Sequence, residues 1–271
     1  MNAQPTIIAI ANQKGGVGKT TSAINLAAGL VRAGRRVLLV DLDAQANTSS
    51  IFAGVQPPTV ETSVYAVFKD RRPAAELMQT TRVPGLWILP AIVQLADVET
   101  LLSGAVDGFF RLKDSLATLA PVHASSGSGT EPAPDAIIID CPPNLGLLTV
   151  NAFVAATHLI VPLQTSRFSL DGLKTILDTA ATVQKRFNSE LRIPGALITM
   201  YNPRTAISHA ISEPIEEYIR VFETKISRTV AIEESHLMSQ TIFEYQPRSK
   251  AALEYESFTR EVLRGVVFEE K

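Results

Sequence analysis

Cysteine is almost absent from this chain of 271 residues, which contains only Cys141. A single thiol excludes an intrachain disulfide, and it excludes a zinc or iron–sulfur site built from paired cysteines of one chain. We expect Cys141 to be a small core residue. The four histidines share no spacing typical of a metal site, so we interpret them as structural or solvated: His123, His158, His209 and His236.

The sequence also lacks an excess of either charge and lacks long apolar runs. Its 25 Lys and Arg stand against 27 Asp and Glu, a net charge of −2, which argues against a generally basic nucleic-acid binder but permits a local patch. No apolar run approaches the roughly 18 residues that a membrane span requires. The N-terminus shows no basic segment followed by an apolar one, as a secretory signal would. We expect a soluble, cytoplasmic, globular protein.

Short β-branched runs alternate with helical stretches along the chain. Strands are expected at residues 6–11, 36–42, 86–89, 136–140, 158–163 and 193–200, and helices at 20–32, 145–156, 170–187 and 207–221. This alternation predicts βαβ units in an α/β fold, with a doubly wound, mostly parallel twisted sheet and helices on both faces. The Ser/Gly/Pro-rich segment 124–136 is interpreted as a flexible surface loop of one domain, with an interdomain linker as the alternative.

A glycine-rich loop provides the strongest motif, because it lies between an expected strand and an expected helix. Its glycines let backbone N–H groups surround phosphate oxygens, and the following helix adds the positive end of its dipole. We expect Lys19 to contact the β- and γ-phosphates of ATP and the Thr20 hydroxyl to ligate Mg²⁺. The predicted nucleotide-binding set is Lys14, Gly15, Gly16, Val17, Gly18, Lys19, Thr20 and Thr21.

The loop departs from the common phosphate-binding pattern at its start. Gln13 stands where the pattern G-x-x-x-x-G-K-[ST] has its first glycine, and Lys14 adds a second lysine beside the same anion. Residues 9–21 (AIANQKGGVGKTT) resemble the deviant Walker A motif of the ParA/MinD family of P-loop ATPases. Residues 37–49 (VLLVDLDAQANTS), 137–152 (IIIDCPPNLGLLTVNA) and 197–205 (LITMYNPRT) resemble blocks of its ParA, Soj-like branch.

This resemblance covers essentially the whole chain and implies a single ParA-type P-loop ATPase domain over residues 1–271. It implies a switch enzyme that binds ATP with Mg²⁺, forms a homodimer around two nucleotides and hydrolyses ATP slowly. In such a dimer Lys14 would reach across to the partner's nucleotide. The resemblance therefore places Lys14 beside Lys19 among the catalytic residues.

Carboxylates end two of the expected strands, at the sheet edge where open α/β folds bind ligands. Asp41 and Asp43 are two residues apart and share a strand face. By resemblance, Asp43 positions or activates the attacking water and Asp41 supports the Mg²⁺ shell, while strand-end solvation or helix capping is the alternative for both. Asp140 ends the run AIIID like a Walker B aspartate that holds Mg²⁺, with an N-cap as the alternative. Asn202 is assigned to the adenine base, or else to a turn before Pro203.

The resemblance also implies non-specific DNA binding by the ATP dimer through basic C-terminal residues. Residues 200–271 contain nine Lys and Arg but twelve Glu, and Ala231 stands where DNA-binding relatives often have arginine, so only folding could create a basic patch. Ordinary solvated surface is the alternative for the candidates, which are Arg204, Arg228, Arg248 and Lys250.

The expected function is to segregate or position chromosomal or plasmid DNA, or another large cargo, with a ParB-like or cargo-adaptor protein stimulating hydrolysis. The protein would then be cytoplasmic and associated with the nucleoid. A MinD-like ATPase acting on a membrane or protein surface is the alternative, but residues 261–271 have acidic flanks and make a poor lipid anchor. A kinase or ligase acting on a metabolite would need an acceptor motif, and none is evident.

Overall fold

A single mixed sheet forms the framework of the computed structural model, which describes residues 4–52, 57–119, 133–165, 169–203 and 212–266. Its strand order is β3-β4-β2-β5-β1-β6-β7, and only β3 runs antiparallel to its neighbour. The strands are β1 Thr6–Ile10, β2 Val37–Asp41, β3 Gln79–Thr80, β4 Leu86–Leu89, β5 Ala136–Asp140, β6 His158–Gln164 and β7 Arg192–Thr199.

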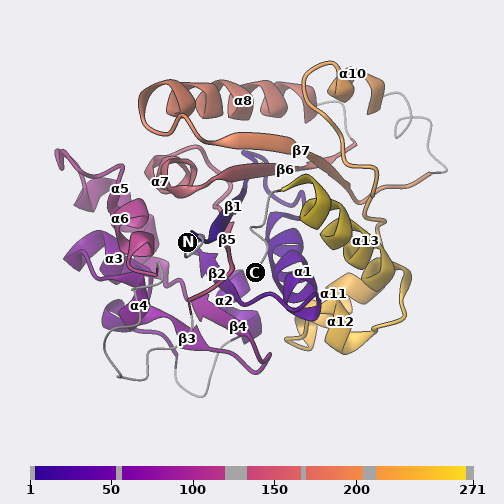
Figure 1. The fold of residues 1–271 in the computed structure, drawn as a ribbon, viewed down its shortest axis with the longest axis horizontal. Helices are drawn as coiled ribbons and strands as arrows, with labels where there is room; N and C mark the ends of the chain where they lie inside the picture. Colours follow the sequence, from indigo (N-terminus) through magenta and orange to yellow (C-terminus); the bar gives the residue numbers. More distant parts are fainter. Residues whose placement is uncertain (1–3, 53–56, 120–132, 166–168, 204–211, 267–271) are drawn as a thin grey trace.

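Helices cover both faces of this sheet (Figure 1). One face carries α3 Tyr65–Asp70, α5 Val98–Leu101, α6 Arg111–Ala117, α7 Leu147–Ala155 and α8 Ser169–Arg186. The other carries α1 Lys19–Arg32, α2 Asn47–Phe52, α12 Ile242–Tyr245 and α13 Lys250–Gly265. The remaining described α-helices are α4 Ala74–Leu77, α10 Ser212–Glu216 and α11 Val230–Leu237.

Two apolar cores result, because the central strands are buried on both faces. In β1, Ile8 and Ile10 pack towards α1 and α13, whereas Ala9 packs towards α7 and its neighbours. In β5, Ile138 joins the first group and Ile137 the second, as the two-residue period of a strand requires. Continuous apolar runs such as AIIID therefore reflect burial on both sides, and the expected doubly wound α/β fold is confirmed.

The six expected strands are present, and the sequence reading missed only β3, whose two residues are too few to form a pattern. The helix expected at 207–221 is wrong at its end, because α10 stops at Glu216. Val221 instead forms a parallel bridge with Ala196 of β7, since the Ala196 N–H donates to the carbonyl oxygen of Arg220 at 2.8 Å. The pairing of this segment with the sheet edge overrides its helical periodicity.

Residues 120–132, which include most of the expected 124–136 loop, lie outside the described residues. The strands before and after that segment nevertheless belong to one sheet, since β5 lies between β1 and β2. Where the chain re-enters the sheet, the Asp135 carboxylate accepts hydrogen bonds from the Arg36 backbone N–H at 2.8 Å and from its guanidinium at 2.9 Å. The elements on both sides thus belong to one sheet, and the interpretation of residues 124–136 as a surface loop stays a prediction.

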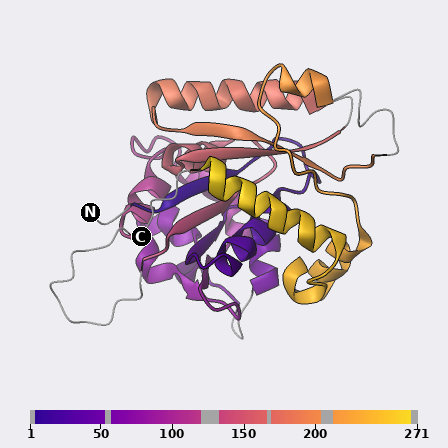
Figure 2. The same ribbon diagram turned by 45° about the vertical axis from the view of Figure 1, so that its right-hand side comes forward.

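The long helix α13 packs closely against α1, as Figure 2 shows. The contact is tight at Gly29, where a Cβ atom would overlap the hydroxyl of Thr259, a residue that is 2% exposed. A hydrogen-bond contact of 3.4 Å between Ser22 Oγ and Tyr255 Oη joins the same two helices. Gly29 thus sets how closely the C-terminal helix approaches the helix that follows the glycine-rich loop.

We expect Gly29→Ala to lower the free energy of unfolding by about 1–3 kcal/mol, because it overpacks this buried contact. Adding Thr259→Ala should restore part of the loss by removing the clashing hydroxyl. Urea denaturation provides the measurement, with Gly265→Ala as the control because a Cβ atom there meets nothing within 4 Å. A Gly29→Ala protein as stable as the wild type would contradict the close approach.

Candidate nucleotide-binding site

The glycine-rich loop connects the end of β1 to the start of α1, as the sequence predicts. Gly16 and Gly18 have φ angles of +71° and +81°, in the left-handed region that glycine adopts without steric cost. A Cβ atom at Gly15 or Gly16 would meet nothing within 4 Å, so the outer side of the loop is open. The loop therefore presents its backbone to a space that phosphate groups can enter.

Two buried side chains that the sequence reading did not single out hold this loop in place. Asn12, 2% exposed, donates its Nδ2 to the carbonyl oxygen of Pro162 at 2.7 Å and accepts the Lys14 backbone N–H at 2.9 Å. The Thr199 hydroxyl lies 2.8 Å from the carbonyl oxygen of Val17, to which it donates. These contacts fix both ends of the loop to β6 and β7, and that fixation preorganises its amides.

The two lysines of the loop occupy different environments. Lys19 is 6% exposed and its ammonium group donates to the carbonyl oxygen of Lys14 at 3.1 Å. Burial lowers the pKa of Lys19, while the charge of Asp140 acts in the opposite direction. Lys14 is exposed on the outside of the same loop. Lys19 thus faces the interior of the loop, and Lys14 is accessible to a second molecule.

Two carboxyl groups meet at the ends of neighbouring strands, because the register of β2 and β5 pairs Asp41 with Asp140. Asp140 is fully buried, and its Oδ2 accepts the Thr48 hydroxyl at 2.7 Å. Its other oxygen, Oδ1, has no hydrogen-bond partner among the described residues. Burial above all, and then the charge of Asp41, raise the pKa of Asp140, while hydrogen bonds from Thr48 and Thr20 lower it.

This arrangement fits a magnesium ion. A buried carboxylate oxygen without a partner among the described residues, close to the Thr20 hydroxyl, is the oxygen-donor chemistry that Mg²⁺ uses when phosphate oxygens and water complete its shell. In the described part of the chain, no three His, Cys, Asp or Glu side chains gather into a metal site of their own. Phosphate oxygens of a bound nucleotide, together with water, would complete the coordination.

Asp41 is buried but differs from Asp140, because both of its oxygens accept hydrogen bonds. Oδ2 accepts the backbone N–H and the hydroxyl of Ser49 at 2.8 and 2.7 Å, and Oδ1 accepts the Asp43 N–H at 3.0 Å. The Ser49 N–H belongs to the first turn of α2, so Asp41 caps this helix, which was the alternative left open by the sequence. Its contribution to a Mg²⁺ shell would be indirect, through the position of Asp140.

Asp43 lies in the turn between β2 and α2 and is half-buried. Its Oδ1 accepts the backbone N–H of Gln45 at 3.0 Å, and its carbonyl oxygen accepts that of Ala46 at 2.8 Å. Ala46 has a φ of +52°, which shows how tightly this turn is wound. The turn places Asp43 at the same sheet edge as Asp140, and its role towards an attacking water stays a prediction.

A cavity of about 150 Å³ opens beside the loop, between Gly18 and Thr21 on one side and residues 226–236 on the other. Met200 and Ile226 contribute to its wall. Thr229 Oγ1 and His236 Nε2 in this wall are buried polar atoms without a partner among the described residues. Burial lowers the pKa of His236, so its imidazole is neutral near pH 7.

A mostly apolar cleft with a few polar atoms suits a nucleoside adjoining bound phosphates. Asn202 is exposed beyond the end of β7 and does not line this cavity, so its assignment to adenine stays a prediction. From the sequence His236 was interpreted as structural or solvated, and Thr229 was given no role, because their place beside the loop depends on contacts between distant segments.

The predicted DNA-binding residues are only partly brought together. Glu254 accepts the hydroxyl of Ser227, the residue before Arg228, at 2.6 Å and pairs with Lys250 at 3.6 Å. Arg248 is exposed just before α13, and Arg204 lies outside the described residues. Glu254 offsets part of the positive charge here, so this set forms no strong basic patch among the described residues.

Comparison with known proteins agrees with this geometry. The family described as "AAA domain" matches residues 5–193. The chain is 40% identical over 258 residues to "Sporulation initiation inhibitor protein Soj" of Bacillus subtilis (strain 168), covering 94% of this chain and 97% of that protein. It is 38% identical over 260 residues to "Chromosome partitioning protein ParA" of Myxococcus xanthus (strain DK1622), covering 95% of this chain and 88% of that protein.

Solved structures share the fold over nearly the whole chain. Cobyrinic acid a,c-diamide synthase from Mycobacterium smegmatis, with bound ATP analog and magnesium, has a TM-score of 0.81 and 33% identity, covering 96% of this chain and 95% of that chain. A putative plasmid partition protein from Borrelia burgdorferi B31 bound to AMPPNP has a TM-score of 0.78 at 23% identity, covering 97% and 100%. Among the described helices of the present chain, none is long and apolar enough to cross a membrane.

The anchoring of the loop by Asn12 leads to a prediction. Asn12→Ala should weaken ATP binding roughly tenfold, because removal of one net hydrogen bond of about 1.4 kcal/mol leaves the loop less preorganised. Titration with a fluorescent ATP analogue measures the affinity, and Gln13→Ala is the control because Gln13 is exposed on the same loop. Equal ATP affinities of the Asn12→Ala and Gln13→Ala proteins would contradict a role for Asn12 in holding the loop.

Proposed function

This chain belongs to the Soj/ParA family of P-loop ATPases, and from that premise we propose that it is a partition ATPase that dimerises with ATP and is reset by hydrolysis. It is an ATPase that uses Mg²⁺. The observation that carries the proposed dimer is the pair of lysines in one loop. Lys19 points into its own loop and would serve the nucleotide there, while the exposed Lys14 would contact a nucleotide held by a second copy.

Each residue of the site has a physical task in this proposal. The amides of the loop and the Lys19 ammonium bind and orient the phosphates and offset their negative charge. Thr20 and Asp140 would hold Mg²⁺, which when bound supplies further positive charge to the transferring phosphoryl group. Asp43, in its tight turn, would orient the attacking water, and the cavity lined by Thr229 and His236 would take the nucleoside. Asp41 stabilises the start of α2 at this sheet edge by accepting the Ser49 backbone N–H.

The proposed cargo is inferred from the named relatives, because the fold by itself does not assign a function. The relatives named for chromosome partitioning support a role in segregating or positioning DNA, with non-specific DNA binding by the ATP dimer and stimulation by a ParB-like partner. The protein would act in the cytoplasm, at the nucleoid. The Mycobacterium smegmatis structure with the same fold is named cobyrinic acid a,c-diamide synthase. Release of phosphate without an added acceptor would distinguish a switch ATPase from such a synthase.

Substitutions of the two lysines should affect ATP binding and dimerisation separately. Lys19→Ala should abolish ATP binding, because it removes the buried cation that faces the phosphates. Lys14→Ala should leave ATP binding by the monomer within about twofold but abolish the ATP-dependent dimer, because its charge would be needed only at the partner's nucleotide. Nucleotide titration and light scattering measure the two properties. If the Lys14→Ala protein still dimerised with ATP, the proposed dimer would be wrong.

A substitution of Asp43 should have the opposite effect on the dimer: the ATP dimer should persist while hydrolysis is lost. Asp43→Ala should lower ATP hydrolysis by roughly a hundredfold or more while the ATP dimer forms and persists, because only the positioning of water is removed. Gln45→Ala keeps the backbone N–H that binds Asp43 Oδ1 and is the matched control. Phosphate release and light scattering on the same samples separate the two effects. Wild-type hydrolysis by Asp43→Ala would exclude it from catalysis.

A further inference from the structure

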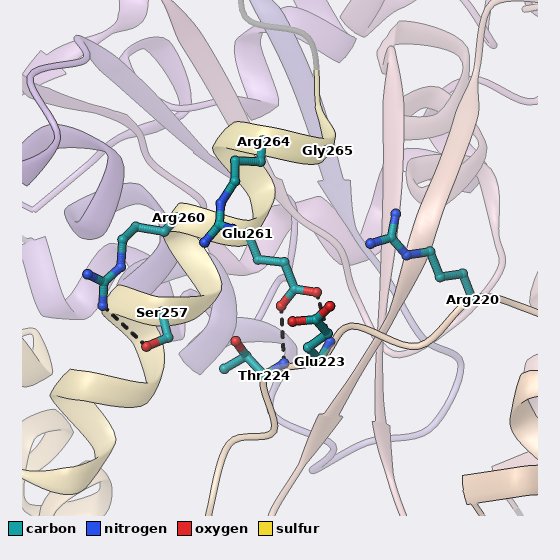
Figure 3. Close-up of a pocket in the computed structure, with 8 residues that line it drawn as sticks. All are labelled: Arg220, Glu223, Thr224, Ser257, Arg260, Glu261, Arg264 and Gly265. Atoms are coloured by element: carbon teal, nitrogen blue, oxygen red, sulfur yellow. Dashed lines mark hydrogen bonds between the residues drawn. The ribbon is translucent and has the colours of Figure 1, made fainter.

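Three arginines from two parts of the chain line a groove of about 470 Å³ that the sequence analysis did not assign (Figure 3). Arg260 and Arg264 lie one turn apart on α13, and Arg220 comes from the segment that pairs with β7. All three residues are exposed. Among the described residues none of the three forms an ion pair, whereas Arg36, Arg72, Arg82 and Arg111 each do so.

The groove is held rigidly at its base. Glu261 on α13 accepts the backbone N–H groups of Glu223 and Thr224 at 2.7 and 3.1 Å, which ties the 220–224 segment to the helix. The carbonyl oxygen of Arg220 accepts the Ala196 N–H at 2.8 Å, which ties the same segment to the sheet. These hydrogen bonds engage both oxygens of Glu261, so its carboxylate holds the 220–224 segment in place, while its negative charge stays in the groove.

The positions of the arginines indicate what kind of anion they suit. Ser257, Arg260, Glu261 and Arg264 follow the spacing i, i+3, i+4, i+7, so they form one stripe along α13. Figure 3 shows the side chains of Arg260, Arg264 and Arg220 spread across the groove rather than converging on one point. Spread guanidinium groups match a chain of phosphates better than one small anion, because each can bind a separate phosphate.

We propose that this groove, lined by Arg220, Arg260 and Arg264, binds the phosphate backbone of duplex DNA. The inference rests on the proposed partition function and deepens it by placing the DNA-binding surface on α13 and the 220–224 segment. It also explains how a C-terminal region with more Glu than Lys and Arg can bind a polyanion. The net charge is an average, whereas in this groove three arginines outnumber two carboxylates, those of Glu223 and Glu261. Other glutamates of the region are engaged elsewhere, as Glu244 is by Arg82.

The test is binding of a random-sequence duplex in the presence of ATP, measured by fluorescence anisotropy at several salt concentrations. The Arg260→Ala/Arg264→Ala protein should bind at least tenfold more weakly. The slope of log K against log salt should fall in magnitude by about 2 for each groove that contacts the duplex, because two arginines per groove no longer neutralise phosphates. Arg260→Lys/Arg264→Lys keeps the charge and should retain most of the slope. Glu223→Gln should bind more tightly than wild type, because it removes a carboxylate from the groove.

A matched control distinguishes a specific effect of the groove from a general loss of positive charge. Lys185→Ala/Arg186→Ala removes two exposed positive charges from the last turn of α8 and should bind DNA as the wild type does. Equal DNA affinity and equal salt slope for the wild type and the Arg260→Ala/Arg264→Ala protein would overturn the proposal. Equal weakening of DNA binding in the groove and control variants would overturn it as well. The substitutions concern exposed side chains, and unchanged thermal unfolding and ATP hydrolysis would confirm that each protein is folded.

A second arm distinguishes DNA from a small phosphate ligand. Tripolyphosphate added to the wild type should compete with DNA only at concentrations far above those of the duplex phosphates. Tight tripolyphosphate binding that is abolished in Arg260→Ala/Arg264→Ala, with DNA binding unchanged, would make the groove a small-anion site and overturn the proposal. If the wild type itself bound no DNA in any nucleotide state, the DNA part of the proposed function would fail first, and this outcome is distinct from failure of the groove alone.

Discussion

Burial of charge at the carboxyl edge of the sheet is the constraint on which the site depends. Asp41 and Asp140 are side by side with no exposed surface, and Lys19 is 6% exposed. A buried charge costs several kcal/mol unless it is paired or hydrogen-bonded, so each group requires a partner. Asp41 obtains three donors and Lys19 a carbonyl oxygen, while Asp140 keeps one oxygen without a donor among the described residues. The structural carboxylate, Asp41, is thus fully hydrogen-bonded, whereas Asp140, the proposed Mg²⁺ ligand, has an oxygen available for a metal.

The sequence predicted the parts of the molecule whose causes are local. Strands buried on both faces produce continuous apolar runs, and a loop that requires left-handed backbone needs glycine, as at Gly16 and Gly18. The anchoring contacts could not be predicted, because their partners are far apart in the chain. Asn12 and Pro162 are separated by 150 residues, Thr199 and Val17 by 182, and Thr48 and Asp140 by 92. Only the folded sheet brings these side chains together.

The same reason explains why the arginine groove escaped sequence analysis. The stripe on α13 follows helical spacing, but Arg220 was expected to lie within a helix ending at residue 221. In the structure its segment pairs with the edge strand β7, and this pairing turns it towards α13. A count of charges over the C-terminal third cannot detect such a site, because it averages over residues that the fold places far from the groove. Glu244 and Glu254, for example, lie outside the groove lining and pair with Arg82 and Lys250.

The segment between Arg220 and Thr229 connects the two sites physically. Its first part lines the arginine groove, and its last part lines the cavity beside the glycine-rich loop. Helix α13 contributes to both, through Arg260 and Tyr255. A nucleotide can alter DNA affinity only if it binds two arrangements of the protein with different free energies. A segment whose two ends line the two proposed sites meets the geometric condition for that difference. In the proposed dimer a second groove would allow two modest phosphate-binding surfaces to act together on one duplex.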